Sequence, residues 1–386
     1  MRTLLRRNVV SEDSSWYTDE VPASPLVQAA APVSKPRVRH ELKIMMSKAA
    51  SITALTLCFG VLTAAPVGAE DPVRIERLEA WRSAFGGKQI KLRVDVQSSQ
   101  PRRGRLVWGL TADKLPLDRG EAQLVAPGEV ELSLELPAIK PGIVQKVSLS
   151  AAFQVEGERE AAAVLQDELY LFAPDPFADR RRRLERLQIV IYDPNGVTAE
   201  QLESARIPCE VTRNLAMLEQ LDEGLVVIGE GLSLRTERAL PEIVLGLARR
   251  GVPVLCLAPT EGPFPLPLVR QLGEAAAASL LFEGRAAISR LDKRLDPAQW
   301  MSTAVTPTHT LALQGEGAEV IAGDAGWPWV EIRLKNPAGK NTPVIINCFP
   351  IIAHWDQGPT PRYLFSELLD YLHAPAASLS HVRNEP

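Results

Sequence analysis

The segment LVVIGEGLSLRTERALPEIVLGLARRGVPVLCLAP, residues 225–259, decides the fold of the second half of the chain. It opens with an unbroken apolar run that ends at Gly229 and continues into an amphipathic stretch over Leu240–Arg250. Gly251 follows as a helix-terminating signal, and a second apolar run covers Val252–Leu257. Apolar runs without alternation are typical of parallel strands that are covered on both faces. The segment therefore predicts an α/β sheet.

The loops after these two strands occupy the places where α/β enzymes build oxyanion holes and nucleophilic turns. The first loop is Gly229-Glu230-Gly231, and the second carries Ala258 and Pro259. Neither Ala258 nor Pro259 has a side chain that can attack a substrate. The sequence thus predicts the frame of an active site without its nucleophile.

The same alternation of strand and helix extends over residues 188–375 and predicts a doubly wound α/β domain. Strands are expected at Ile189–Tyr192, Pro208–Val211, Leu225–Gly229, Val252–Leu257 and Pro343–Phe349, and helices at Ala199–Ala205, Leu215–Leu221, Leu240–Arg250 and Pro361–His373. Thr198 is expected to cap the first of these helices. Asp193 follows the first strand, where ligand groups often lie. Residues 263–341 depart from the rhythm, with strands expected at Leu311–Leu313 and Trp329–Leu334, and are predicted to be an insertion or cap over the carboxyl edge of the sheet.

Residues 70–173 instead alternate apolar and polar side chains with a period of two, as in QIKLRVDV (residues 89–96) and EVELSLEL (residues 129–136). Six or seven such strands, separated by Gly, Pro and Asp turn signals, predict an immunoglobulin-like β-sandwich. Residues 174–187 form a linker, in which the four arginines Arg180–Arg183 begin a short helix. We interpret these arginines as a solvated charged face rather than an anion site.

The N-terminal residues have the composition of two further segments. Residues 1–44 lack apolar periodicity and are predicted to be disordered or an over-extended reading frame. Residues 45–69 combine flanking lysines, an apolar run and a small-x-small pattern before Glu70, which predicts a cleaved signal peptide and an exported, periplasmic or extracellular protein. The alternatives are an uncleaved signal anchor, which would give a single-pass membrane-anchored protein, and a buried helix. Residues 376–386 are expected to be a disordered tail.

Charge and motif content exclude several classes of function. The chain has 43 basic and 47 acidic residues, a net charge of −4, so it has no basic surplus for nucleic acid. It also lacks a phosphate-binding loop, H-E-x-x-H and C-x-x-C motifs, and it predicts neither a cofactor nor a metal. Cys209, Cys256 and Cys348 each lie in an apolar run and are expected to be buried and unpaired.

Three segments of residues 188–372 resemble the class I glutamine amidotransferase-like domain, a flavodoxin-like fold. LVVIGEG (residues 225–231) is similar to the family's oxyanion loop, and GVPVLCLAP (residues 251–259) resembles its nucleophile strand G-x-P-V-L-G-x-C-x-G. INCFPIIAHWD (residues 346–356), followed by PRYLFSELLDYL (residues 361–372), is similar to its final strand, His-x-Glu pair and closing helix.

The resemblance implies a site in which a Cys nucleophile, a His base and an orienting acid work beside backbone N–H groups. Aligned on P-V-L, Ala258 occupies the nucleophile position, and Cys256 lies two residues earlier inside the strand. His354 and Asp356 keep the spacing of the base and the acid. The domain is therefore degenerate, and we expect Asp193, Gly229, Glu230, Gly231, Ala258, His354 and Asp356 to contact a ligand.

An immunoglobulin-like module followed by such a domain also resembles accessory regions of exported bacterial glycoside hydrolases, with DELYLFAPDPF (residues 167–177) at the junction. The leading hypothesis is an exported, non-catalytic protein whose crevice binds a small molecule, a protein or a glycan. One alternative is a cysteine-dependent amidase or hydrolase that uses Cys256, His354 and Asp356. Another is an envelope scaffold anchored by residues 49–69.

Overall fold

The computed structural model describes residues 72–261, 264, 269–271, 287–301, 303–308, 311–313, 319–322 and 329–374. The chain divides into two units, Met1–Val67 and Gly68–Pro386. The predicted N-terminal segments 1–44 and 45–69 and the tail 376–386 lie outside the described residues. Within the described ranges, no helix combines the length and the apolar character that a membrane crossing requires.

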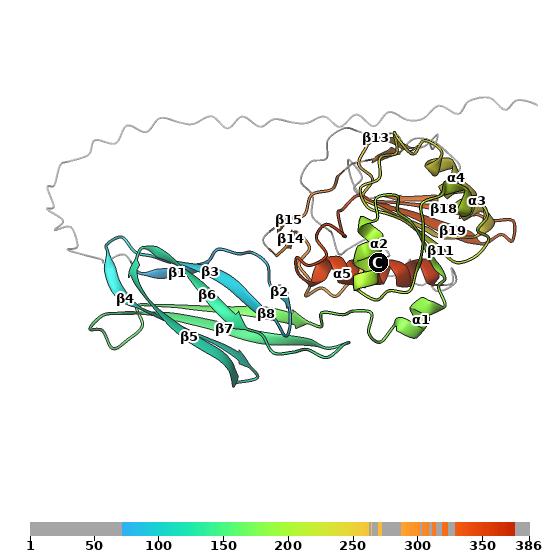
Figure 1. Cartoon of the computed structure of the whole chain (residues 1–386). Coiled ribbons are helices and arrows are strands. Elements are labelled where there is room, and N and C mark those ends of the chain that lie inside the picture. Colours follow the sequence, from blue (N-terminus) through green and yellow to red (C-terminus); the bar gives the residue numbers. More distant parts are fainter. Residues whose placement is uncertain are drawn as a thin grey trace, which may run out of the picture. The chain divides into compact units, whose positions relative to one another are not determined.

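Two facing sheets make up the first part of the larger unit (Figure 1). One has the order β1-β3-β6 and consists of β1 (Arg74–Arg77), β3 (Gln89–Gln97) and β6 (Gly128–Glu135). The other has the order β2-β8-β7-β4-β5 and consists of β2 (Ser83–Phe85), β8 (Ala163–Phe172), β7 (Val144–Val155), β4 (Arg102–Ala112) and β5 (Leu115–Ala126). All neighbouring strands are antiparallel except β2 and β8, which run parallel.

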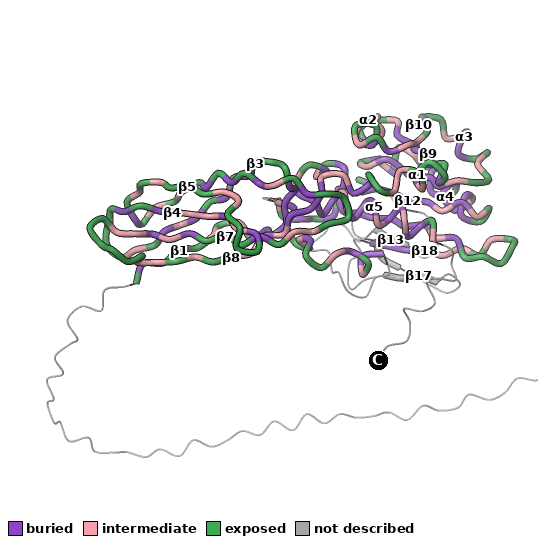
Figure 2. Tube along the Cα trace, turned by 90° about the horizontal axis from the view of Figure 1, so that it is seen from below, coloured by how far each residue is buried: buried purple, intermediate pink, exposed green. Residues whose placement is uncertain are grey.

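Both sheets contribute to one hydrophobic core between them. Buried and exposed residues alternate along β3, as the period of two predicts (Figure 2). Leu92 and Leu132 from the first sheet and Leu106 and Phe153 from the second all belong to this core. The β-sandwich predicted from the sequence is therefore confirmed.

The second part is built around a seven-stranded sheet of order β10-β9-β11-β12-β19-β18-β17. Its strands are β9 (Ile189–Tyr192), β10 (Glu210–Thr212), β11 (Leu225–Ile228), β12 (Val254–Leu257), β17 (Glu319–Ala322), β18 (Trp329–Lys335) and β19 (Asn341–Asn347). The five strands from β10 to β19 are parallel, whereas β18 and β17 are antiparallel to their neighbours. Numbered along the chain, the parallel strands have the order 2-1-3-4-5.

Helices cover both faces of this sheet, as an α/β arrangement requires. The helices are α1 (Arg181–Glu185), α2 (Val197–Ser204), α3 (Leu215–Glu219), α4 (Leu240–Arg250) and α5 (Pro359–His373). Residues of α3 and α4 pack on one face, and residues of α1, α2 and α5 pack on the other. Short elements complete the described part of the domain: β13 (Val269–Gln271), η1 (Ile288–Arg290), β14 (Gln299–Trp300), β15 (Thr303–Ala304) and β16 (Leu311–Leu313).

Three sequence predictions are corrected by these assignments. The end of the predicted insertion is not a cap, because β17 and β18 extend the main sheet. The residue that caps α2 is Gly196, and the Thr198 hydroxyl instead accepts a hydrogen bond from the amide of Glu230. Arg180 is not part of a solvated face, because its guanidinium contacts Ser366, Glu367 and Asp370 of α5.

Candidate functional site

Ala258 follows β12 at the carboxyl edge of the sheet in a strained conformation. Its φ is +31°, a backbone angle that residues other than glycine rarely adopt. Its amide donates a hydrogen bond to the carbonyl of Asn347 at 2.6 Å, and the residue is fully buried. A strained turn of this kind is how α/β hydrolases present a nucleophile. Here the turn presents only a buried methyl group.

Cys256 lies inside β12 and faces the core on the α4 side of the sheet, together with Cys348. Burial raises the pKa of the Cys256 thiol to about 12, so the thiol is protonated at neutral pH. Because the thiolate is the reactive form, this environment makes Cys256 a packing residue rather than a nucleophile.

His354 and Asp356 both lie in the turn 351–356 that follows β19. The His354 ring packs edge-to-face against Trp300, with ring centroids 5.6 Å apart, and its buried Nδ1 has no hydrogen-bond partner among the described residues. Asp356 instead pairs with Arg362. The spacing of base and acid is kept, but Asp356 does not orient His354 through Nδ1.

Backbone N–H groups that would form an oxyanion hole are already in use. The amide of Gly229 donates to the Tyr192 carbonyl at 2.9 Å, and that of Gly231 donates to the Ala258 carbonyl at 3.1 Å. The amide of Glu230 donates to the Thr198 hydroxyl at 2.8 Å. The residue after the turn is Pro259, which has no N–H. None of these four positions offers a donor to a substrate oxygen.

Glu230 uses its side chain to tie the loop after β11 to the turn 351–356. Its carboxylate accepts hydrogen bonds from the amides of Ile352 at 2.6 Å and Ala353 at 2.8 Å. Burial raises the pKa of this carboxyl, and the amide hydrogen bonds offset part of that effect. The predicted ligand-contacting side chain thus has partners within the protein.

Asp193 occupies the equivalent place after β9 but is completely buried. Its two carboxylate oxygens accept hydrogen bonds from the amides of Gly196 and Ala199, both at 2.9 Å, at the start of α2. A Cβ on Gly229 would lie 3.0 Å from the Asp193 carboxyl carbon, so a glycine fits best at this close approach. Asp193 therefore stabilises α2, and its predicted contact with a ligand conflicts with its burial.

An exposed rim remains around these buried groups. It consists of Gly231, Thr260, Thr308, Ala353 and Asp356. The amide of Thr260 bonds to the Leu232 carbonyl at 3.0 Å, and the hydroxyl of Thr308 bonds to the Pro259 carbonyl at 2.9 Å. These two bonds hold the loop that carries Pro259 and Thr260 to the loop after β11 and to the segment that carries Thr308.

Sequence reasoning missed Thr308, because no local pattern indicates that its segment returns to the sheet edge. Trp300 and Trp329 are buried in the core, and Trp327 lies outside the described residues. In the part of the chain that the structure describes, no group of three His, Cys, Asp or Glu residues is placed to hold a metal ion.

No family model matches the chain, and no curated protein matches it. Among solved structures, the sporulation control protein Spo0M from Bacillus subtilis has a TM-score of 0.19 and 11% identity over 34% of this chain and 55% of that chain. A cycloisomaltooligosaccharide glucanotransferase from Paenibacillus sp. has a TM-score of 0.23 and 8% identity over 52% of this chain and 29% of that chain. The PKD domain of an M14-like peptidase from Thermoplasmatales archaeon SCGC AB-540-F20 has a TM-score of 0.19 and 13% identity over 27% of this chain and 98% of that chain. Likenesses this low carry no argument about function.

Proposed function

We propose that the protein is an exported, non-catalytic binding protein. In this proposal an immunoglobulin-like sandwich precedes a degenerate, flavodoxin-like domain of the glutamine amidotransferase-like type, which serves as the ligand- or partner-binding module. The 2-1-3-4-5 order of the five parallel strands supports the flavodoxin-like assignment.

The observation that carries the non-catalytic part is the state of the turn at Ala258. A hydrolase of this type needs a reactive nucleophile and free N–H donors aimed at the developing oxyanion. At this turn the side chain is a methyl group and the following residue, Pro259, has no N–H. The amides of Gly229, Glu230 and Gly231 are bonded within the protein. Loss of the nucleophile and of the oxyanion donors together supports recognition as the remaining role.

An assay of glutamine hydrolysis tests this proposal on the full chain. We expect no ammonia release above buffer from the wild type, from Cys256→Ala or from His354→Ala. Ala258→Cys should also be inactive, because the variant restores a thiol but not the N–H that Pro259 lacks. Ammonia release by the wild type that disappears in Cys256→Ala and His354→Ala would establish the cysteine hydrolase instead.

Binding is tested with a glycan array, because the domain order resembles accessory regions of glycoside hydrolases. Ala353→Trp places a large side chain on the exposed rim, and Leu115→Trp places the same side chain on an exposed position of the sandwich strand β5. We expect glycan binding by the wild type and by Leu115→Trp, and its loss in Ala353→Trp. A blank array would exclude the glycans tested, and binding that survives Ala353→Trp would exclude the rim.

Export is tested by the mass of the mature chain. The proposal expects cleavage before Glu70. Recovery of a chain that retains residues 45–69 in the membrane fraction would instead support the anchored scaffold.

A further inference from the structure

Arg362, near the start of α5, connects the turn 351–356 to the chain that leaves the sandwich. Its Nε donates a hydrogen bond to the Trp355 carbonyl at 3.0 Å, and its Nη2 pairs with the Asp356 carboxylate. Its Nη1 donates to the carbonyl of Pro174, just beyond β8, at 2.7 Å. One guanidinium therefore holds the end of the turn and the start of the linker together.

The guanidinium also lies over the aromatic ring of Phe85 in β2, with its central carbon 4.7 Å from the ring centroid. Phe85 is 4% exposed, and among the described residues it belongs to none of the hydrophobic cores. A cation within about 6 Å of a ring centroid is attracted by the face of the ring, more strongly where water is excluded. Arg362 therefore has a buried partner on the sandwich as well as its partners on the turn.

The next residue of α5 contacts the same end of the sandwich. The ring of Tyr363 meets Phe172 of β8 edge-to-face, with centroids 5.2 Å apart, and its hydroxyl donates to the Ala173 carbonyl at 3.2 Å. Phe172 is the register partner of Phe85 in the parallel pair of β8 and β2. The start of α5 is thus packed against two neighbouring aromatic rings of the sandwich.

Buried contacts fix where the turn itself lies. Three of its residues belong to the core: Ile351, Ile352 and Trp355. Glu230 accepts hydrogen bonds from two of its amides. Asp356 is not held in this way, because its side chain is 67% exposed and Arg362 is the one partner of its carboxylate among the described residues. The direction of this carboxylate therefore depends on Arg362.

We propose that Arg362 is a positioning residue for Asp356 at the exposed rim, and that the sandwich sets its orientation through the ring of Phe85. The inference rests on the proposed function only in taking Asp356 as part of a recognition surface. The guanidinium is planar and its donors form a rigid fork, so one orientation has to serve the ring, the two carbonyls and the carboxylate. Without the ring the guanidinium is free to tilt, and the Asp356 carboxylate moves with it. In this proposal the sandwich is part of the site rather than a separate module.

The test is a ¹⁵N TROSY spectrum of the deuterated full chain, recorded without ligand. The amide of Asp356 follows the Trp355 carbonyl to which Arg362 is bonded, so its chemical shift reports on that bond. The amide of Gln357 bonds to the His354 carbonyl at 2.9 Å, and its hydrogen exchange reports how firmly this end of the turn is held. In Arg362→Met we expect the Asp356 signal to move and exchange at Gln357 to rise about tenfold, the scale of a lost hydrogen bond to a charged group.

Phe85→Leu decides whether the sandwich takes part, because it removes the ring and leaves the turn unchanged. We expect both amide signals to change in the same direction as in Arg362→Met, by a smaller amount. Lys88→Met is one control, because it removes the other cation over this ring, at 5.2 Å. Phe153→Leu is the second, because it makes the same substitution in the core of the sandwich. Both controls should leave the two amide signals as in the wild type.

The double variant Phe85→Leu/Arg362→Met completes a double-mutant cycle. If Phe85 acts through Arg362, the double variant should match Arg362→Met alone. Effects that add, or an unchanged Asp356 signal in Phe85→Leu, would overturn the proposal. Arg362→Lys replaces the methionine variant if that variant does not fold, because lysine keeps the charge but lacks the planar fork. No ligand enters the measurement, so its failure is distinguishable from a failure of the proposed binding function.

Discussion

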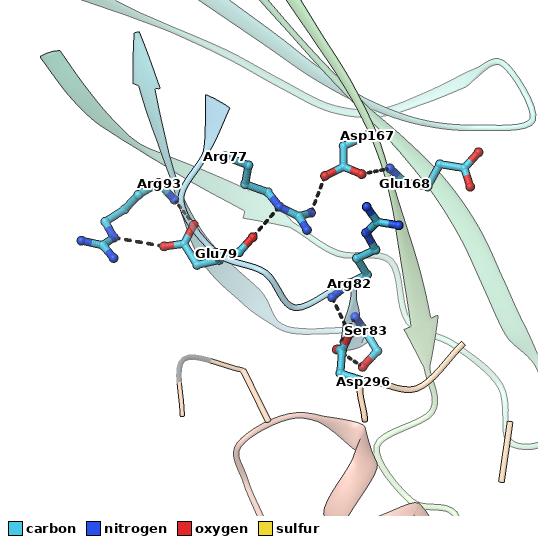
Figure 3. Close-up of polar contacts among 8 residues, drawn as sticks. All are labelled: Arg77, Glu79, Arg82, Ser83, Arg93, Asp167, Glu168 and Asp296. Atoms are coloured by element: carbon cyan, nitrogen blue, oxygen red, sulfur yellow. Dashed lines mark hydrogen bonds and ion pairs between the residues drawn. The ribbon is translucent and has the colours of Figure 1, made fainter. Parts of the chain in front are cut away.

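Asp296 accepts hydrogen bonds from Ser83 through both its amide, at 2.8 Å, and its hydroxyl, at 2.5 Å (Figure 3). The amide of Arg82 donates to the same carboxylate at 2.8 Å. Ser83 belongs to β2 of the sandwich, whereas Asp296 lies in the segment between β12 and β18. One carboxylate therefore ties an edge strand of the sandwich to a segment of the α/β domain.

Replacing Asp296 with alanine should destabilise the protein by about 1.5–3 kcal/mol, the range for hydrogen bonds to a charged group. The amide and hydroxyl of Ser83 lose their acceptor in this variant. Urea unfolding measures the change. Asp292→Ala is the control, because Asp292 pairs with Arg294 two residues away, near the surface, where such pairs contribute about 0–1 kcal/mol. If Asp296→Ala and Asp292→Ala lowered the free energy of unfolding equally, the structural role of Asp296 would be contradicted.

The same residue should add a pH dependence to stability. Burial is the main cause that raises the pKa of Asp296, and its hydrogen bonds to Ser83 and Arg82 offset part of the effect. The resulting contribution to stability is present below the ordinary Asp pKa of about 3.9 and is lost as the pH rises through the raised value. Compared with Asp296→Asn, the wild type should lose stability over this window. Urea midpoints at a series of pH values check the prediction, and parallel curves for the two proteins would contradict it.

Gly120→Ala should destabilise the sandwich by about 1–3 kcal/mol, the usual range for overpacking. A Cβ at this position of β5 would overlap the indole ring of Trp108 on the neighbouring strand β4. Gly109→Ala is a matched control on β4, because its Cβ would lie 3.7 Å from the nearest atom, the hydroxyl oxygen of Ser150. Thermal unfolding should show a lower midpoint only for Gly120→Ala.

Asp193→Ala should lower the free energy of unfolding by about 1–2 kcal/mol, because α2 loses the acceptor for the amides of Gly196 and Ala199. Asp193→Asn keeps one side-chain carbonyl oxygen and should cost less. Asn214→Ala removes the side-chain cap of α3. The stability lost in this variant gives the contribution of a single cap, with which the loss in Asp193→Ala is compared. If Asp193→Ala unfolds at the wild-type urea midpoint, Asp193 does not hold the start of α2.

Native thiol labelling should distinguish the cysteines by burial. Cys209 is half-buried, whereas Cys256 and Cys348 are buried. Burial raises the pKa of all three thiols, for Cys256 to about 12. We expect iodoacetamide at neutral pH to label Cys209 slowly and the other two only after denaturation, as read by peptide mass mapping. Rapid labelling of Cys256 in the native protein would contradict its buried position.

Local signals were sufficient for the strongest elements of the fold. Helix α4 spans the residues predicted for it, and Gly251 ends it with a φ of +103°. The apolar runs at Ile189–Tyr192 and Leu225–Ile228 form buried parallel strands. These elements were predictable because periodicity, composition and end signals agree within each segment.

Elements that depend on distant partners were not predictable in the same way. Strand β5 carries no clear strand signal, because Pro116, Asp118 and Gly120 resemble turn residues, and its position at the end of the five-stranded sheet tolerates them. No local pattern in β18 or in β19 indicates that these two strands pair with each other.

In the candidate site, the positions of the side chains could be predicted from the sequence, but their contacts could not. Sequence position placed Asp193 and Glu230 correctly after the strands β9 and β11. It did not reveal that their carboxylates bond to the protein's own amides, because the partners of Glu230 lie more than a hundred residues away, at Ile352 and Ala353. Where a strand ends can be predicted from local sequence, but what its final polar side chain contacts depends on tertiary structure.

The register of β19 has a consequence for how this fold can vary. Asn347 pairs with Leu257 at the end of β12 on one side and with Trp329 at the start of β18 on the other. Leu257 and Trp329 therefore lie on opposite sides of one strand, about 10 Å apart at the usual strand spacing. Between them the chain adds β17 (Glu319–Ala322) to the sheet beyond β18. A different length of chain between Ala258 and Glu319 is thus compatible with the same order of the strands, and this part of the chain also contacts the sandwich through Asp296.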